Sequence, residues 1–558
     1  MSLRNLGPDQ TRKLNRQDSK LVLAHMYFAM FNLLLGGVAA LLQVLVRSGT
    51  LELPAGIGYY QLLTIHGVTL ALVFTTFFIM GFQIAAVSRV CGDLTSTQRL
   101  LSWIGFYTMI IGTVAAAIMI LLNEATVLYT FYAPLKAHFI YYVGLALVIV
   151  GSWISAAGQI MRYVQWKREN KGDKSPLLSY MVAINNVMWM VCSLGVAIEV
   201  LFMLIPWSIG WVERVDVSLS RTLFWYFGHA LVYFWLLPAY MVWYVVVPKI
   251  IGTKGFSDNL ARMSFMLFLF FSIPVGIHHQ LVDPGIDAFW KYIQVVLTFM
   301  VVIPSLMTAF SLFATFEIFG REKGAKGLFG WLKHLPWNDS RFILPFIGML
   351  AFIPGGAGGL VNASNQMNQV IHNTIWVTGH FHLTISTAVV LTYFGAMYWL
   401  IPYCSGRILT KRLNKLALIQ GYTWAVGMSI MSGAMHFIGL FGAPRRSDYS
   451  EYGGAEQAKE WIAYQAVQAV GGTLLFLSIL LVLYICIHLA FFAPKGQEIF
   501  PVSEAFDRDE KVYPLVENWK FLIVVTIALI LIAYTVPVSQ MLLDPAPGAK
   551  GFGKGQVW

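Results

Sequence analysis

The chain alternates long apolar runs with short polar connections. Each run holds about 20 residues or more, the length that a helix needs to cross the ~30 Å hydrocarbon layer of a membrane. Thirteen such runs lie at 21–46, 60–88, 101–123, 138–161, 178–206, 222–248, 263–281, 288–317, 342–360, 374–403, 417–441, 466–493 and 519–543. The pattern predicts an all-α polytopic membrane bundle of about thirteen transmembrane helices.

Composition supports a membrane protein. Hydrophobic residues make up 58% of the 558 residues and charged residues only 12%, both outside the usual range of soluble domains. The connections are short, without internal repeats or low-complexity tracts, so we expect one membrane domain over residues 1–558. A polar, basic stretch with no small-residue cleavage site precedes the first run, which we interpret as a retained anchor.

The basic residues are divided unevenly between the connections on the two sides of the predicted membrane. If the N-terminus lies inside, most of the 38 Lys and Arg residues fall on the inner side, including those of 162–174 and 321–333. This is the bias of the positive-inside rule. The net charge of +11 is therefore explained by membrane orientation, and we expect no nucleic-acid partner.

The spacing of the cysteines argues against two kinds of metal-containing site. The four of them, Cys91, Cys192, Cys404 and Cys486, form no C-x-x-C and no C-x-x-C-H motif. The chain is therefore expected to hold neither a thiolate metal cluster nor a covalently attached c-type haem. Any such centre would belong to a partner.

Histidines gather at one predicted depth. Six of the twelve histidines fall in the outer third of four apolar runs: His66, His229, His278, His279, His380 and His382. Polar groups inside a membrane are costly and tend to mark pathways or cofactors, and neutral imidazole suits both copper and haem iron. We expect cofactor ligands. The alternative from another class is a transporter whose histidines relay protons.

The stretch TGHFHLT at 378–384 carries two of these histidines. At about 100° per helical residue, His380 and His382 are about 200° apart and cannot bind one metal ion. They therefore predict two cofactors, one on each face of the helix. His66 can complete a bis-histidine haem with one of them, which leaves the other as the sole protein ligand of a haem with an open coordination site.

The stretch SIPVGIHHQLVD places His278 and His279 at the end of an apolar run. Pro274 and Gly276 can loosen the last turn enough for both side chains to reach one ion. His229, in the run 222–248, is available as a third ligand. Three imidazoles suit copper, and a copper ion that faces an open haem makes a binuclear centre for O₂ or NO.

With these motifs, the chain resembles subunit I of the haem-copper oxidases. The resemblance rests on the G-H-F-H-L and H-H pairs, the H-x-x-x-Y of His229 and Tyr233, and segments such as NEATVLYTFYAPLK and APRRSDY. They are most similar to the B-type branch of bacterial cytochrome c oxidases, with a b-type and an a-type haem. The resemblance implies three ligand sets: His66 and His382 for the low-spin haem, His380 for the high-spin haem, and His229, His278 and His279 for copper B.

Tyr233 separates two reactions of this family. It lies at i+4 from His229, so its phenol is expected beside the copper, and in the family this tyrosine is bonded covalently to the histidine. Splitting O₂ takes four electrons, and a phenol can supply one of them with a proton. The related NO reductases carry a glutamate near this position, so Tyr233 favours O₂ reduction.

Hydroxyl groups predict a proton path. The A-type branch carries a glutamate two residues after the first copper histidine, where this chain has Leu231, so that acidic route is absent. Hydroxyls on two runs instead form stripes: Tyr240 and Tyr244 on one, and Ser305, Thr308 and Ser311 on the other. In isolation, the Ser and Thr groups would be expected to bond back to helix carbonyls. Their match to the B-type analogue of the lysine path favours a water-linked channel.

Residues of the outer loops are predicted to contact the haems. Arg445 and Arg446 are expected to clamp haem propionates, because guanidinium groups pair with carboxylates. His372, Tyr132 and Trp225 are further candidates for propionate contacts or for the wall of the site. Two positions depart from the family: Ala230 replaces a proline, and Asn368 replaces an aspartate, so no proton-loading role is carried over to Asn368.

The resemblance implies the catalytic subunit of a proton-pumping terminal oxidase in a prokaryotic inner (plasma) membrane. It also implies a subunit II with the electron-entry site, expected to be a dinuclear copper centre, and a small single-helix subunit as a further partner. Cytochrome c and quinol both remain open as the electron donor. An NO-reductase-like enzyme is the nearer alternative.

Overall fold

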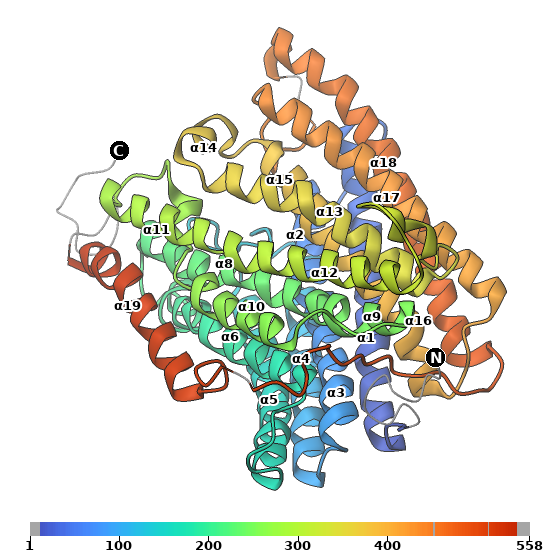
Figure 1. Cartoon of the computed structure of the whole chain (residues 1–558). Coiled ribbons are helices and arrows are strands. Elements are labelled where there is room, and N and C mark those ends of the chain that lie inside the picture. Colours follow the sequence, from blue (N-terminus) through green and yellow to red (C-terminus); the bar gives the residue numbers. More distant parts are fainter. Residues whose placement is uncertain (1–11, 450–451, 512, 544–558) are drawn as a thin grey trace.

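The computed structural model describes residues 12–449, 452–511 and 513–543. Within these ranges the protein is helical and contains no β-strand, as Figure 1 shows. The predicted domain of residues 1–558 includes residues 1–11, 450–451, 512 and 544–558, which lie outside the described residues. Below, "inner" and "outer" ends of the bundle follow the orientation predicted from the basic residues.

Most helices are long. The first half of the chain forms α1 (Arg16–Arg47), α2 (Tyr59–Gly67), η2 (Val68–Phe74), α3 (Thr75–Cys91), α4 (Ser96–Leu121), α5 (Phe139–Glu169), α6 (Leu177–Glu199), η3 (Val200–Leu204), α7 (Ile205–Ser208), α8 (Val217–Met241), η4 (Val242–Val246), α9 (Val247–Ile251), α10 (Asp258–Ser272) and η5 (Ile277–Gln280). The second half forms α11 (Ala288–Met300), α12 (Val302–Glu322), η6 (Gly330–His334), α13 (Ser340–Ala363), α14 (Asn365–Ile371), α15 (Ile375–Phe381), η7 (His382–Val389), α16 (Val390–Ser405), α17 (Lys411–Leu440), η8 (Tyr452–Gly454), α18 (Glu456–Ile487), η9 (His488–Phe492) and α19 (Trp519–Leu543).

The all-helical membrane fold is confirmed, with a smaller number of clear spans. Each of the thirteen predicted runs falls largely in helix, and eleven helical segments of the described chain are long and apolar enough to cross a membrane. The other two runs correspond to α10 and α17. The helix α10 has only 15 residues, because the chain leaves the helix at Ser272. The helix α17 has 30 residues, but small and polar side chains dilute its apolar character.

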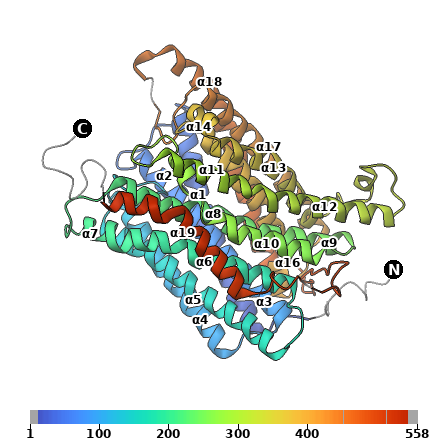
Figure 2. The same cartoon turned by 60° about the vertical axis from the view of Figure 1, so that its left-hand side comes forward.

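Glycines bring α4 and α5 into backbone contact. A Cβ added at Gly112 would lie 2.4 Å from the carbonyl oxygen of Gly144, and one added at Gly105 would lie 2.4 Å from that of Gly151. Both distances are too short for any side chain. Small residues allow this close approach in membranes, where helices gain little from hydrophobic burial against one another. The two helices accordingly run side by side along one edge of the bundle (Figure 2).

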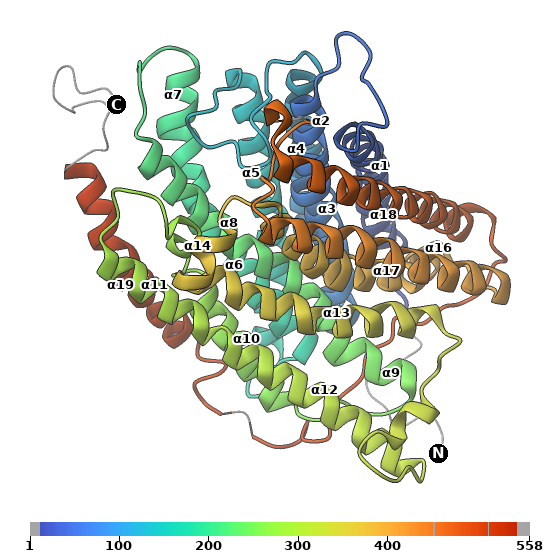
Figure 3. The same ribbon diagram turned by 90° about the horizontal axis from the view of Figure 1, so that it is seen from above.

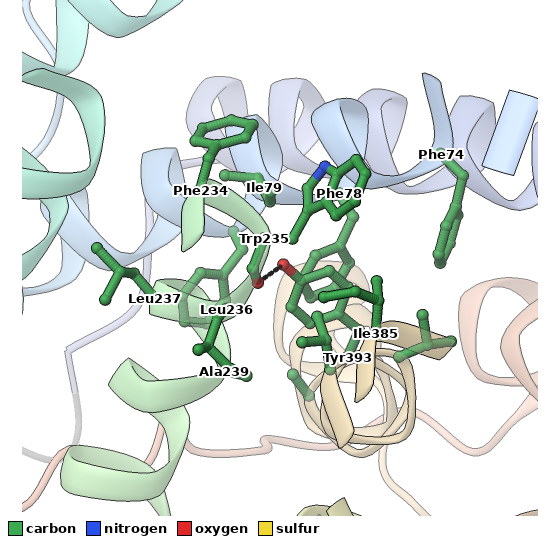
Figure 4. Close-up of a cluster of buried hydrophobic side chains, with 14 of the residues drawn as sticks. Phe74, Phe78, Ile79, Phe234, Trp235, Leu236, Leu237, Ala239, Ile385 and Tyr393 are labelled. Atoms are coloured by element: carbon green, nitrogen blue, oxygen red, sulfur yellow. Dashed lines mark hydrogen bonds between the residues drawn. The ribbon is translucent and has the colours of Figure 1, made fainter. Parts of the chain in front are cut away.

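The helix α8 is anchored in the centre of the bundle. Pro238 has no N–H to donate to the carbonyl of Phe234, and Asn185 of α6 donates to that oxygen instead, at 3.4 Å. One residue further, the Tyr393 hydroxyl donates to the carbonyl oxygen of Trp235 at 2.5 Å, inside the apolar cluster of Figure 4. These bonds hold the helix that carries His229 and Tyr233.

Wide π-helical turns occur next to the predicted site residues. The segment η2 begins two residues after His66, η7 begins at His382, and η4 lies between Met241 and Val247. Such turns insert an extra residue and redirect the side chains that follow, and they are frequent at functional sites. They were not predicted from the sequence.

A buried ion network closes the inner end of α10. Arg262 donates to Asp258 at 2.7 Å and to Glu517, just before α19, at 2.6 Å. Lys167 and Ser175 also donate to the Glu517 carboxylate, at 2.7 and 2.5 Å. Burial alone would raise the pKa of Glu517, but the bonds from Lys167 and Ser175 and the charge of Arg262 lower it from the ordinary value. The network ties α10 to α19 and to the connection before α6.

Replacing Glu517 by Gln should destabilise the protein at neutral pH by about 1.5–3 kcal/mol, the typical contribution of hydrogen bonds to charged groups. Because the pKa is lowered in the folded protein, this stabilisation is complete above pH ~4.5 and fades as the pH falls through the lowered value. Thermal unfolding at pH 7 and at pH 4 measures the difference. Glu456→Gln, which breaks the exposed pair with Lys459, should change stability by less than about 0.5 kcal/mol. Equal melting of Glu517→Gln and wild type at pH 7 would contradict the role of the network.

Candidate metal centre

One cavity of about 770 Å³ collects the predicted cofactor ligands. Its wall includes side chains from α1, α2, α8, α12, α13, α17 and α18. Six histidines lie in it: His66, His229, His278, His279, His380 and His382. Side chains that are far apart in the sequence therefore converge on one interior space.

His66 and His382 face each other across part of this cavity. Their ring centroids are 6.1 Å apart and their planes differ by 7°. Two imidazoles on opposite sides of one ion, with bonds of about 2.0–2.1 Å, place their centroids about 6 Å apart. The Nδ1 atoms lie 3.2 Å from the Gly36 carbonyl oxygen and 2.8 Å from that of Thr378, which orients each ring and leaves both Nε2 atoms available. The spacing is one at which His66 and His382 would hold a single haem iron between them.

His380 contacts a different part of the protein from His382. It lies against the glycine-rich part of α13, where a Cβ added at Gly358 would be 2.7 Å from its Nδ1 atom. The Thr384 hydroxyl lies 3.3 Å from the same nitrogen. The structure thus places His380 and His382 against separate neighbours, and only glycine at position 358 leaves room for the His380 ring.

His229, His278 and His279 form a compact cluster. Their possible ligand atoms lie within 4.8 Å of one another, and within the described parts of the chain no other group of three or more His, Cys, Asp or Glu side chains meets this spacing. Nδ1 of His229 is 3.2 Å from Nε2 of His279. Three imidazoles around one point, with no carboxylate among them, match the donor set of a copper site.

The break after α10 supplies two of the three histidines of this cluster. The chain leaves the helix after Ser272 and re-enters a short 3₁₀ turn, η5, which carries both adjacent histidines. At Gly276, an added Cβ would lie 2.4 Å from the Trp225 carbonyl oxygen of α8, so only glycine permits this contact. The break and the tight 3₁₀ turn, rather than a continuous α-helix, let His278 and His279 face the same point.

Neighbouring side chains orient the three rings. The Thr298 hydroxyl lies 3.0 Å from Nδ1 of His278, and the ring of His279 stacks on Trp225 at 3.9 Å. Nε2 of His229 is buried with no hydrogen-bond partner among the described residues. An unpaired buried nitrogen is costly, so the cluster suits a bound ion better than an empty core.

Tyr233 lies beside the cluster and also lines the cavity. Its ring centroid is 5.2 Å from that of His229, one helical turn away on α8. The structure therefore places the phenol next to the candidate copper ligands. Leu231 lies in the same wall, where a carboxylate would stand in the A-type pattern.

A chain of hydroxyls extends from this region toward the inner end. The Tyr244 hydroxyl donates to Thr308 at 3.0 Å, and Ser264 of α10 lies 3.0 Å from the same Thr308 oxygen. Tyr240 is paired with Ser305, and Ser311 lies beside Tyr244. The five predicted hydroxyl residues are therefore neighbours across α8, η4 and α12.

The row of hydroxyls shows two further features. Ser305 and Thr308 do bond back to the carbonyls of Val301 and Pro304, at 3.1 and 2.8 Å, while they also contact the tyrosines. Ser264, which donates to Pro304 at 2.9 Å, was missed. The only available signal was one hydroxyl in the apolar run MSFMLFLFF.

The predicted outer contacts divide into two groups. Arg445, Arg446 and Trp225 line the cavity, whereas His372 and Tyr132 do not. Nε of Arg445 and one terminal nitrogen of Arg446 are buried without a partner among the described residues. Unpaired guanidinium donors beside a cavity suit a carboxylate-bearing ligand.

His372 and Tyr132 form a layer behind these arginines. Tyr132 lies 3.4 Å from a guanidinium nitrogen of Arg446. His372 contacts Asn368 at 3.1 Å and approaches Asp283 at 4.0 Å. Burial, with a smaller effect of Arg445, lowers the pKa of His372 to about 4, so its imidazole is neutral at physiological pH. Asp283, missed in the sequence analysis, pairs with Arg221 at 2.9 Å.

Comparisons with known proteins agree with this arrangement. The family model described as "Cytochrome C and Quinol oxidase polypeptide I" matches residues 20–474. The chain is 40% identical over 509 residues to cytochrome c oxidase subunit 1 of Thermus thermophilus, with 89% of each chain covered. It is 24% identical over 448 residues to the subunit of Bacillus sp. (strain PS3), with 76% of this chain and 68% of the relative covered.

A solved structure is similar over nearly the whole chain. A cryo-EM structure of a haem-copper terminal oxidase dimer superposes with a TM-score of 0.87 and 38% sequence identity, covering 94% of this chain and 92% of the other. The agreement includes the fold as well as the sequence. The chain therefore belongs to the haem-copper oxidase family, as polypeptide I, the catalytic subunit of a terminal oxidase.

Proposed function

We propose that this subunit reduces O₂ to water between His380 and the cluster of His229, His278 and His279, and that the reaction is coupled to proton pumping. In this assignment His66 and His382 hold a low-spin b-type haem, His380 holds a high-spin a-type haem, and the three-histidine cluster holds copper B. When bound, the high-spin haem and the copper supply the O₂-binding site and electrons. One observation carries the proposal. The imidazoles of His229, His278 and His279 converge beside Tyr233, in the cavity that also contains His380.

Tyr233 is the proposed catalytic side chain. Reduction of O₂ to two water molecules consumes four electrons and four protons, and a phenol can give one of each. The ring centroid of Tyr233 lies 5.2 Å from that of His229, which supports this role. The same feature favours O₂ reduction over an NO-reductase-like reaction.

Protons for this chemistry are proposed to enter through the hydroxyl chain. Tyr244, Thr308 and Ser264 bring together η4, α12 and α10, and Tyr240 and Ser305 lie on the side nearer to Tyr233. A hydroxyl can accept one proton while it releases another, so a row of hydroxyls and water molecules can pass protons without a carboxylate. The back-bonds of Ser305 and Thr308 hold those oxygens in line.

Haem propionates are proposed to bind between Arg445 and Arg446. The unpaired nitrogens of both side chains lie at the cavity, and the Tyr132 hydroxyl contacts Arg446 from behind. Trp225 forms the wall beside His279. Asn368 cannot take up a proton as an aspartate would, so we assign it no proton-loading role.

The subunit is proposed to work in a prokaryotic plasma membrane with a subunit II that carries a dinuclear copper electron-entry site. A small single-helix subunit is a further proposed partner. The relatives include both cytochrome c oxidases and a probable quinol oxidase subunit of Staphylococcus haemolyticus. Both donors are therefore kept as alternatives.

The ligand assignment predicts different losses for two neighbouring histidines. His382→Ala should lose the low-spin haem and keep the high-spin one, whereas His380→Ala should do the reverse, because the two side chains face separate partners. Reduced-minus-oxidised spectra of the purified variants measure this. His488→Ala, which lies outside the cavity, is the control and should keep both haems. Loss of the same haem in both test variants would refute the assignment.

The proposed role of Tyr233 is tested by removing its hydroxyl alone. Tyr233→Phe keeps the ring, so both haems and most of the copper should remain, while steady-state O₂ consumption should fall by at least about a hundredfold, or ~2.7 kcal/mol of barrier. Tyr422→Phe, at an exposed position on α17, should retain wild-type turnover. If Tyr233→Phe turns over near the wild-type rate with full cofactor content, the phenol serves only packing.

The hydroxyl chain predicts slow proton uptake in three variants. Tyr244→Phe, Thr308→Val and Ser264→Ala should leave the first haem oxidation after flash mixing with O₂ unchanged. The later proton-coupled steps should slow by about tenfold, or ~1.4 kcal/mol of barrier, in the first two variants and by less in the third. Ser429→Ala is the control. The Ser429 hydroxyl also bonds to a helix carbonyl, that of Ala425, but it does not belong to the proposed row of hydroxyls. Normal turnover and pumping in all three variants would show that protons enter elsewhere.

A further inference from the structure

A loop at the inner end of the bundle has no role in the account above. It comprises residues 323–339 and joins the membrane-spanning segments Ala288–Glu322 and Ser340–Ala363. Figures 2 and 3 show it at the periphery of the molecule, where it curls back beside the end of α12. None of its residues lines the cavity that holds the six histidines, so it is separate from the metal centre.

A buried tryptophan holds this loop on α12. Trp331 is 7% exposed, and its ring stacks on that of Phe316 at 5.2 Å. A Cβ added at Gly320 would lie 2.4 Å from the Trp331 side chain, so only glycine allows this close approach. Arg321 also donates to the carbonyl oxygen of Ala325, at 3.1 Å. The loop is therefore packed in a defined conformation against the helix.

The Trp331 contact also sets the depth of the loop. Phe316 precedes Glu322, the last residue of α12, by six residues, or about 9 Å along the helix axis. Because Trp331 stacks on Phe316, the chain turns back toward the membrane after it leaves α12. The residues next to Trp331 thus lie at the level of the last turns of a spanning helix, where the bilayer meets the inner aqueous phase.

At this depth the loop exposes bulky apolar side chains. Leu328 and Phe329 are each 59% exposed, and Trp337 is 44% exposed. The ring centroid of Phe329 lies 6.4 Å from that of the buried Trp331, so the exposed ring is close to the one that anchors the loop. Apolar and aromatic side chains at this level of a membrane protein are suited to the boundary between headgroups and acyl chains.

Unpaired lysines lie in the same loop. Lys323, Lys326 and Lys333 are all exposed, and no carboxylate of the described residues lies within 4.0 Å of their amino groups. Lysine is depleted in interfaces between proteins, which argues against a partner subunit on this surface. Basic side chains directly inside a spanning helix attract anionic lipid headgroups instead. The lysines and the exposed apolar group together match the surface of a negatively charged leaflet.

We propose that residues 323–339 form a lipid-binding loop. Leu328 and Phe329 insert at the inner surface of the bilayer, and the three lysines bind the phosphate groups of anionic phospholipids. The ligand class is a phospholipid with a net negative headgroup, for which phosphatidylglycerol is the probe. The bound lipid holds the inner end of α12, the helix that also carries Thr308. This lipid site does not depend on the proposed reaction.

A fluorophore on the loop tests the insertion. Phe329→Cys is labelled with bimane in the purified oxidase complex, which is then reconstituted into phosphatidylcholine nanodiscs. Lipids that carry a nitroxide near the headgroup end of the acyl chain should quench this label. Lys171→Cys, at an exposed position in the polar connection after α5, is the control and should stay unquenched. Wild-type protein treated in parallel gives the background from the four native cysteines.

Lipid charge is tested with the same label. Nitroxide-bearing phosphatidylglycerol should quench Phe329→Cys at least about twofold more strongly than the same fraction of nitroxide-bearing phosphatidylcholine, because the lysines concentrate the anionic lipid. The preference should disappear at ~1 M salt, where the screening length is only about 3 Å.

Two sets of charge variants identify the cations responsible. The preference for phosphatidylglycerol should also disappear when three lysines of the loop are replaced together, as Lys323→Gln, Lys326→Gln and Lys333→Gln. The matched control removes the same charge from three exposed cations at the inner start of α17, as Lys411→Gln, Arg412→Gln and Lys415→Gln, and should retain the preference.

Equal quenching of Phe329→Cys by the two lipids would overturn the anionic lipid site. A label that neither lipid quenches would overturn the insertion as well: quenching by iodide would then place the loop in water, and protection from iodide would place it under another subunit. Leu328→Cys repeats the measurement if Phe329→Cys does not fold. Because the fluorescence requires neither haem nor turnover, a failure of the proposed function would be seen separately.

Discussion

Polar side chains inside a hydrocarbon layer have to find partners, because each unsatisfied group there costs free energy that helix packing does not return. In this protein the constraint acts on six histidines. Backbone carbonyls orient His66 and His382, and Thr298 and Trp225 orient His278 and His279. What remains after these bonds is a set of imidazole nitrogens that line one cavity, and we propose that metal coordination satisfies them.

The helices around the cavity have breaks and close contacts that bring these histidines together. Backbone distortions occur next to the proposed ligands: α10 ends before η5, which carries two adjacent histidines, and η7 begins at His382. Glycine allows the closest approaches, at Gly276 against α8 and at Gly358 against His380. Away from the cavity, α4 and α5 pack by regular glycine contacts and contribute no side chain to its wall.

Much of this architecture could be predicted from the sequence. Apolar runs located the helices, because length and hydropathy are local properties. The spacing of His380 and His382 indicated two faces, and Pro274 with Gly276 indicated a loosened turn. The π-helical turns could not be predicted, since an extra residue in a turn depends on contacts with neighbouring helices. For the same reason, Ser264 beside Thr308 and Asp283 beside Arg221 emerged only from the structure.

The central claim is that one chain holds two chemically different haems, one with both axial positions filled by histidine and one with an open position. The most direct measurement is the CO difference spectrum of the reduced, purified protein, combined with its total haem content. The account predicts two haems per chain, of which only one binds CO. A protein without haem, or one in which both haems bind CO, would contradict it.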